Sequence, residues 1–166
     1  MPLDIVILAA GQGTRMNSSL PKVLHPIAGK SMLQHVIDAA HAFDDAKMHV
    51  VIGHGAEQVR QAIVGDIHWV EQAQQLGTGH AVLQALPKLR SSATVLVLYG
   101  DVPLVNPATL KQMVLATAER GMTLLTVELE NPSGYGRIIR NAQGLVASIV
   151  EQKDADEEQL RIREVN

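Results

Sequence analysis

The stretch Asp4-Ile-Val-Ile-Leu-Ala-Ala-Gly-Gln-Gly-Thr-Arg-Met16 decides the fold class. Residues 4–9 form a short, continuous and mainly apolar run rich in β-branched side chains, which predicts a strand buried on both faces. A glycine-rich segment ends the run at Gly11. Because ligands of open parallel sheets bind beyond the carboxyl ends of the strands, this segment is a candidate binding loop.

Apolar runs and helical periodicity alternate along the chain. The pattern predicts strands at 49–52, 67–70 and 94–99, and helices at 32–43, 56–64, 78–86 and 107–120. Ser31 is the expected N-cap of the first helix. From Met122 the pattern changes to strands at 122–129, 136–140 and 145–151. We therefore expect an α/β fold with a mostly parallel sheet, helices on both faces and a few antiparallel strands added late. Because ligands of such sheets bind beyond the carboxyl ends of the strands, we expect the site in the loops after residues 9, 70 and 99.

The composition excludes several classes of protein. The chain has 166 residues and no cysteine, which excludes disulfides, thiolate zinc sites and a cysteine nucleophile. The longest apolar run, Ile5–Ala10, is far shorter than the ~18 residues that a membrane helix needs. No basic residue precedes this run, as it would in a signal peptide. The sequence thus predicts a cytoplasmic protein with no membrane partner.

The net charge of −3 is unevenly distributed. All of the excess acid lies in residues 151–166, and we interpret the charge run 151–164 as a solvated edge. No acidic residue occurs between Ile5 and Ile37, whereas Arg15 and Lys22 are basic. This distribution predicts a site for a small anion. A nucleic-acid surface would need a broad basic excess and stacking aromatics, so no nucleic-acid partner is expected.

The first loop has the residues that an anion site needs. Gly11 and Gly13 let the backbone approach a ligand and direct N–H groups at an anion. Arg15 and Lys22 add a guanidinium fork and an ammonium charge. The loop is not a Walker A motif, and Met16 stands at the third glycine position of the dinucleotide fingerprint, which disfavours a dinucleotide-dependent oxidoreductase. The alternative interpretation is a glycine turn beside two solvated cations.

Two later segments offer a metal ligand and a base-binding group. Asp101 follows the predicted strand 94–99 and suits Mg²⁺, which takes one or two carboxylates together with phosphate oxygens and waters. Its alternative role is to cap the turn at residues 102–103. Gln72, with Gly77 and Thr78, provides donors and an acceptor for the edge of a pyrimidine. The alternative there is a polar loop in which Thr78 caps a helix.

A weaker pattern fits the recognition of sugar hydroxyls. Gly136 and Glu151 are small or polar residues at the ends of predicted strands, and Asn166 is a polar residue further along the chain. A glycine-rich turn between strands is the simpler explanation. The seven histidines lack the i, i+4 pairing of a metal site on one helix, and we interpret most of them as surface or cap residues.

Taken together, these segments resemble a known family, the sugar-nucleotide pyrophosphorylases. Within it they are most similar to the N-terminal domain of the bacterial bifunctional N-acetylglucosamine-1-phosphate uridyltransferase/glucosamine-1-phosphate acetyltransferases. The resemblance runs from residue 3 to residue 166. The matching motifs are Ala9-Ala-Gly-Gln-Gly-Thr-Arg-Met16, Pro21-Lys22, Val23-Leu-His25, Ala28-Gly-Lys30, His35-Val-Ile-Asp38, Gln75-Leu-Gly-Thr-Gly-His80, Leu98-Tyr-Gly-Asp-Val-Pro-Leu104, Gly134-Tyr-Gly-Arg-Ile138 and Val150-Glu-Gln-Lys-Asp154.

The resemblance implies a Rossmann-like nucleotidyltransferase fold and a set of site residues. Arg15 and Lys22 would be catalytic and hold the triphosphate, and Asp101 would bind Mg²⁺. Recognition of the uracil would use Gln72, Gly77 and Thr78, and contacts to the N-acetylglucosamine moiety would come from Gly136, Glu151 and Asn166. Further substrate contacts are implied for Leu8, Ala9, Ala10, Gly11, Gly13, Tyr99 and Gly100.

The implied reaction joins UTP and N-acetylglucosamine 1-phosphate, with Mg²⁺, to give UDP-N-acetylglucosamine and pyrophosphate for cell-wall and lipopolysaccharide precursors. Residues 1–166 are then expected to be a uridyltransferase domain that is incomplete at its C-terminus and weak or inactive alone. A second Mg²⁺ ligand, an asparagine, and the β-helix acetyltransferase domain that makes the full-length protein a homotrimer would lie beyond Asn166. The alternatives are a thymidylyl- or cytidylyltransferase and a catalytically silent nucleotide-sugar-binding domain.

Overall fold

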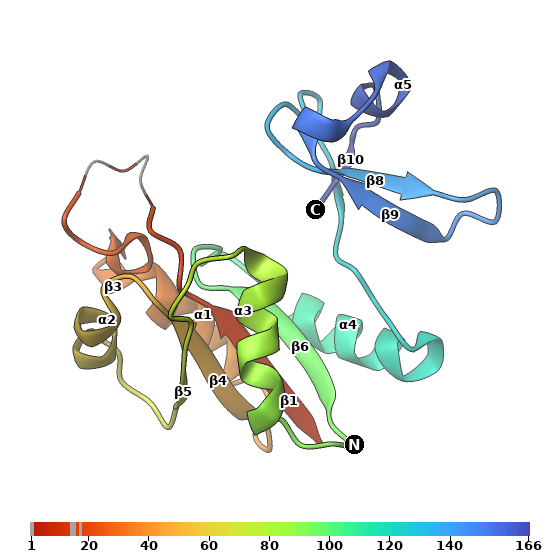
Figure 1. Ribbon diagram of the computed structural model, residues 1–166. Coiled ribbons are helices and arrows are strands. Elements are labelled where there is room, and N and C mark those ends of the chain that lie inside the picture. Colours follow the sequence, from red (N-terminus) through yellow and green to blue (C-terminus); the bar gives the residue numbers. More distant parts are fainter. Residues whose placement is uncertain (1, 14–15, 17) are drawn as a thin grey trace. The chain divides into compact units, whose positions relative to one another are not determined.

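The computed structural model describes residues 2–13, 16 and 18–166 (Figure 1). The chain divides within a helix into two compact units, Met1–Val114 and Leu115–Asn166. Within the described residues, no helix combines the length and the apolar character needed to cross a membrane.

A parallel sheet of four strands forms the first unit. Its strands are β1 (Leu3–Leu8), β4 (Lys47–Ile52), β5 (His68–Glu71) and β6 (Thr94–Tyr99), in the order β5-β4-β1-β6. Every neighbouring pair in this order is parallel. The expected α/β fold with a parallel sheet is therefore confirmed, and β1, the strand of the opening stretch, pairs on both sides.

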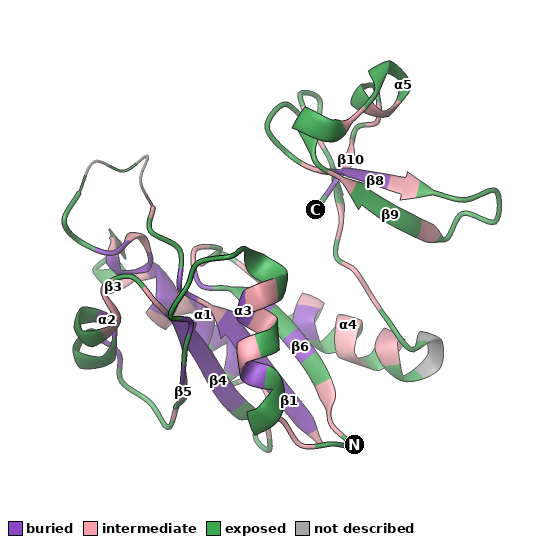
Figure 2. Ribbon diagram, in the orientation of Figure 1, coloured by how far each residue is buried: buried purple, intermediate pink, exposed green. Residues whose placement is uncertain are grey.

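Helices cover both faces of this sheet (Figures 1 and 2). The side chains of alternate strand residues therefore form one hydrophobic core on each face. Ile5 and Ile7 of β1 pack with α1 (Met32–Ala40), whereas Val6 packs with Ala81 and Ala85 of α3 (Thr78–Ala85). Alternate residues of a strand point to opposite faces, so a strand buried on both sides has to be apolar throughout.

Two further helices contribute to the core of the first unit. Val59 of α2 (Ala56–Ala62) and Leu110 of α4 (Pro107–Arg120) join the core on the α1 side. The loop after β1 continues into the one-turn helix η2 (Lys22–Leu24) and the hairpin of β2 (Pro26–Ile27) and β3 (Lys30–Ser31), and η3 (Leu86–Lys88) follows α3.

Ser31 caps α1 as predicted, since its side chain accepts a hydrogen bond from the Gln34 amide at 3.2 Å. The helix ends at Ala40, three residues before the predicted end. Helix ends fray into turns, and here His41, Ala42 and Phe43 continue with turn-type backbone hydrogen bonds.

The second unit is an antiparallel sheet of its own. Its strands are β7 (Val127–Glu128), β8 (Arg137–Arg140), β9 (Val146–Val150) and β10 (Glu164–Val165), in the order β7-β10-β8-β9. The helices η4 (Gln152–Asp154) and α5 (Glu157–Leu160) connect β9 to β10. The acidic segment 151–166 therefore holds two helical turns and a strand.

Two expectations for this part of the chain were wrong. The antiparallel strands do not extend the parallel sheet but form a separate one. The predicted strand 122–129 contains only the two residues of β7. Strand β7 pairs with β10, a strand that the sequence pattern did not indicate. A two-residue strand has too few residues to show alternation, so its partner is set by tertiary pairing alone.

Asp4, near the start of β1, anchors the segment that follows η3 to the sheet. The carboxylate is fully buried and accepts from the Arg90 backbone amide at 2.7 Å and from Arg90 Nε at 2.9 Å. Burial raises the pKa of Asp4, but the Arg90 hydrogen bonds and charge outweigh it and hold the pKa below the usual 3.8. The ion pair therefore stabilises the fold at every pH at which Asp4 is charged.

We expect Asp4→Asn to lower the free energy of unfolding at pH 7 by about 2–4 kcal/mol, because it leaves Arg90 beside a neutral, imperfectly paired group. The carboxylate's contribution is present above the unfolded-state pKa and is lost as the pH falls through the lower folded-state pKa. The deficit of the variant should therefore shrink below pH 3.8. Urea titrations at pH 7 and pH 3 measure this difference, with the exposed Asp44→Asn as the control. Equal deficits at both pH values would contradict the ion-pair assignment.

Candidate active site

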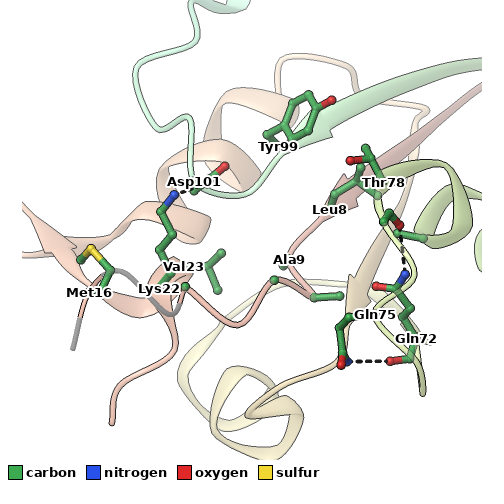
Figure 3. Close-up of a pocket in the computed structure, with 15 residues that line it drawn as sticks. Leu8, Ala9, Met16, Lys22, Val23, Gln72, Gln75, Thr78, Tyr99 and Asp101 are labelled. Atoms are coloured by element: carbon green, nitrogen blue, oxygen red, sulfur yellow. Dashed lines mark hydrogen bonds and ion pairs between the residues drawn. The ribbon is translucent and has the colours of Figure 1, made fainter. Parts of the chain in front are cut away.

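A cavity of about 630 Å³ opens at the carboxyl ends of β1, β5 and β6 (Figure 3). This volume suits a small-molecule ligand. The sequence predicted that the loops after residues 9, 70 and 99 would carry the site, and the cavity is lined from all three. The lining residues are Leu8, Ala9, Ala10, Gly11, Gly13, Met16, Lys22, Val23, Gln72, Gln75, Gly77, Thr78, Ala81, Tyr99 and Asp101.

Two glycines let backbone segments come together around the cavity. Gly13 has a φ of +60°, and a Cβ there would lie 2.7 Å from the Cβ of Lys22. Gly100 donates its amide to the Leu8 carbonyl at 2.9 Å, and a Cβ at Gly100 would lie 3.1 Å from the same oxygen. Glycine at these positions therefore holds Lys22 against the first loop and the end of β6 against β1.

Lys22 and Asp101 meet at one side of the cavity, although 79 positions separate them in the chain. Lys22 Nζ lies 2.6 Å from Asp101 Oδ2, and the two side chains are 41% and 31% exposed (Figure 3). Lys22 comes from η2, and Asp101 lies two positions after Tyr99, the last residue of β6. Asp101 thus pairs with Lys22, which the sequence assigned to the candidate anion site. This pairing favours a binding-site role for Asp101 over the turn-capping alternative. Their partial exposure leaves both groups accessible to a ligand.

Gln72 lies across the cavity from this ion pair and is 3% exposed. Its Nε2 donates to the Gly77 carbonyl at 3.2 Å and contacts His80 Nδ1 at 2.9 Å. Thr78 is the first residue of α3, and the N-cap is Gly77, without a side-chain cap. The alternative in which Thr78 caps the helix is therefore wrong, and Thr78 instead faces the cavity (Figure 3).

Most predicted site residues of the first unit line the cavity. They are Leu8, Ala9, Ala10, Gly11, Gly13, Lys22, Gln72, Gly77, Thr78, Tyr99 and Asp101. Gly100 lies between two lining residues and supports the strand end, as described above. Arg15 lies outside the described residues. The cavity is also lined by four residues to which the sequence assigned no role in the site, Met16, Val23, Gln75 and Ala81.

The three predicted sugar-binding residues lie together in the second unit. Arg137 of β8 pairs with Val150 on one side and Val165 on the other, so Gly136 stands next to both Glu151 and Asn166. A Cβ at Gly136 would lie 3.0 Å from Ile149 Cγ2 and 3.9 Å from Glu151 Cδ. Glycine thus allows close packing at this end of the sheet, and the three residues lie side by side at the ends of neighbouring strands.

The donor set around Asp101 fits a magnesium ion. Within the part of the chain that the structure describes, no three His, Cys, Asp or Glu residues come together as a metal cage. Mg²⁺ rarely uses such cages and is more often held by one or two carboxylates, with phosphate oxygens and waters completing the octahedron. A single accessible carboxylate in a cavity lined by a lysine meets that requirement when a phosphate ligand is present.

Comparison with known proteins identifies the family. A family model described as the MobA-like NTP transferase domain matches residues 5–155. The chain belongs to this family. The bifunctional protein GlmU of Marinobacter nauticus is 63% identical over 166 residues, which cover 99% of this chain and 37% of that protein. GlmU of Cellvibrio japonicus is 59% identical over 165 residues, again with 99% of this chain covered. The chain thus spans little more than a third of the length of these relatives, and the predicted relationship to a bifunctional family is confirmed.

Solved structures show the same fold. UDP-glucose pyrophosphorylase complexed with UDP-glucose aligns with a TM-score of 0.76 and 21% identity over 99% of this chain and 74% of that one. Rv0371c of Mycobacterium tuberculosis H37Rv, in complex with manganese, aligns with a TM-score of 0.56 and 24% identity over 98% of this chain and 77% of that one. The predicted Rossmann-like nucleotidyltransferase fold is therefore confirmed.

Proposed function

We propose that this chain is the nucleotidyltransferase part of an enzyme that makes UDP-N-acetylglucosamine and pyrophosphate from UTP and N-acetylglucosamine 1-phosphate. The observation that carries the proposal is the Lys22–Asp101 pair, which places an anion-binding and a cation-binding group together in a cavity of about 630 Å³. The GlmU relatives at 63% and 59% identity support the choice among nucleotidyltransferases.

The chemistry needs positioning and positive charge more than a general base. A sugar phosphate with a second pKa of ~6 is mostly a dianion at neutral pH and attacks the α-phosphorus of UTP without losing a proton. The protein has to align two anions and offset their repulsion. We assign this role to Lys22, together with Arg15 of the same glycine-rich loop. Mg²⁺ held by Asp101 would stabilise negative charge on the phosphates and on the leaving pyrophosphate.

Two further sets of residues would recognise the uracil and the sugar. Gln72, Gly77 and Thr78 would hold the uracil at the end of the cavity formed by the loop after β5. Gly136, Glu151 and Asn166, which are neighbours in the second unit, would contact the N-acetylglucosamine moiety. Manganese in Rv0371c supports a divalent cation in this fold, and Mg²⁺ is the ion we propose here.

For the longer protein, we extend the proposal to what the sequence resemblance implies. Residues 1–166 would be an incomplete uridyltransferase domain that works in the cytoplasm. Later residues would supply a second Mg²⁺ ligand and an acetyltransferase domain that forms a homotrimer. The small molecules named above would be its partners, with no nucleic acid or membrane involved.

Release of pyrophosphate tests the proposal. UTP, N-acetylglucosamine 1-phosphate and Mg²⁺ are incubated with the chain and, in parallel, with the full-length protein, and pyrophosphate is measured with a coupled enzyme. We expect release from UTP to exceed release from CTP or dTTP, with weaker turnover by the 166-residue chain. Binding of UTP without release by the full-length protein would instead identify a silent binding domain. Faster release from dTTP or CTP would indicate a thymidylyl- or cytidylyltransferase.

A further inference from the structure

The amide nitrogen of Gln72 is fully used by the protein itself. Its two hydrogens meet two acceptors, the Gly77 carbonyl at 3.2 Å and His80 Nδ1 at 2.9 Å. Gln72 is 3% exposed, so water cannot replace either acceptor without cost. The Gly77 carbonyl accepts but cannot donate, which favours the nitrogen over the oxygen on that side of the amide.

The amide oxygen of Gln72 is left for a ligand. In Figure 3 it lies on the side of the amide that faces Ala9 and Leu8, both of which line the cavity. No hydrogen bond to this oxygen occurs among residues 2–13, 16 and 18–166. The cavity therefore presents a hydrogen-bond acceptor, with fixed polarity, to whatever occupies the space in front of Gln72.

The orientation of the Gln72 amide also depends on His80. Its Nδ1 accepts from Gln72 only while that nitrogen carries the lone pair, and the hydrogen of a neutral ring is then on Nε2. Nε2 lies 3.1 Å from the amide of Gln84, whose oxygen and nitrogen have nearly the same shape. Gln84 is only half-buried and can turn its oxygen to Nε2–H, giving up a 3.3 Å contact with the His80 carbonyl. Gln72 is buried and has no such freedom.

We infer that His80 is a positioning residue that holds the Gln72 oxygen toward the cavity and so selects a pyrimidine with a hydrogen on N3. This inference rests on the proposed nucleotide-binding function. Uracil and thymine carry N3–H and can donate to the oxygen. Cytosine has a lone pair at N3, which would face the Gln72 oxygen with no proton between them, and buried polar groups left unpaired in this way discriminate strongly against a ligand.

The test compares three variants of the 166-residue chain. Competition binding gives the dissociation constants of CTP and UTP for each variant, and the ratio of the two constants is compared. His80→Leu and His80→Phe both remove the Nδ1 acceptor. Using both keeps the test valid if one of them fails to fold. His80→Asn keeps an acceptor close to the Nδ1 position. We expect the first two to reduce the preference for UTP by about five- to tenfold, the effect of one hydrogen bond, and the Asn variant to retain most of it. In the full-length protein, KM for UTP should rise in the first two while kcat changes little.

The outcomes distinguish a failure of the His80 inference from a failure of the proposed function. An unchanged ratio in folded His80→Leu and His80→Phe overturns the role of His80 and leaves the proposed function standing. A wild-type protein that binds UTP no better than CTP overturns both. A further check on the unaltered chain uses 3-methyluridine 5′-triphosphate, in which a methyl group replaces N3–H. It should bind as weakly as CTP, and binding equal to that of UTP would contradict the assigned polarity of Gln72.

Discussion

Replacement of Lys22 by methionine should lower kcat for pyrophosphate release by about 10²-fold or more, the loss found when a donor to transition-state charge is removed. Methionine keeps most of the apolar stem that passes Gly13 but has no ammonium group. The charge of Lys22 Nζ, now 2.6 Å from Asp101 Oδ2, is available to phosphates that enter the same cavity. Initial rates at saturating UTP, compared with wild type in the same length of chain, measure the effect.

The matched control for this variant is Lys30→Met. Lys30 is also a partly exposed lysine paired with a carboxylate, that of Asp38, but it does not line the cavity. Its replacement should change kcat by less than about twofold, as expected for a surface substitution. Lys22→Arg, which keeps the charge, should recover part of the lost rate. Near-normal turnover of Lys22→Met would remove Lys22 from the proposed chemistry.

The sequence was sufficient to predict how the site is brought together. A strand apolar at every position, such as residues 5–8, must be buried on both faces, and parallel strands then bring their following loops to one edge. That argument joined Lys22, Gln72 and Asp101 before any contact was known. The structure confirms the meeting of Lys22 with Asp101 across 79 positions.

What the sequence did not predict depends on tertiary contacts. His80 is one of seven histidines whose spacing in the sequence does not match a metal site. Its role follows from the 2.9 Å contact of its Nδ1 with Gln72, which lies eight positions earlier in the chain. Sequence spacing does reveal that His80 and Gln84 are one helical turn apart, which was the available indication. Strand β10 has only two residues, and its partners β7 and β8 are set by pairing rather than by pattern.

Replacement of Asp101 by asparagine should raise the metal concentration needed for half-maximal activity by at least about tenfold, since loss of even an indirect partner of a metal ligand costs about 10–100-fold in affinity. The amide keeps the size of the side chain but lacks the negative charge that Mg²⁺ prefers. It also leaves Lys22 Nζ without its 2.6 Å anionic partner, so an uncompensated positive charge would stand beside the metal position.

Two measurements separate this effect from general damage to the enzyme. Binding of Mn²⁺ in the presence of UTP, followed by electron paramagnetic resonance, reports on the metal without turnover, and a Mg²⁺ titration of pyrophosphate release reports on activity. Asp38→Asn is the matched control, because Asp38 is also a partly exposed carboxylate paired with a lysine, and it lies outside the cavity lining. Both titrations should shift for Asp101→Asn and neither for Asp38→Asn. If the metal titrations of Asp101→Asn matched those of wild type, Asp101 would not be a ligand, and its ion pair with Lys22 would serve only to position the lysine.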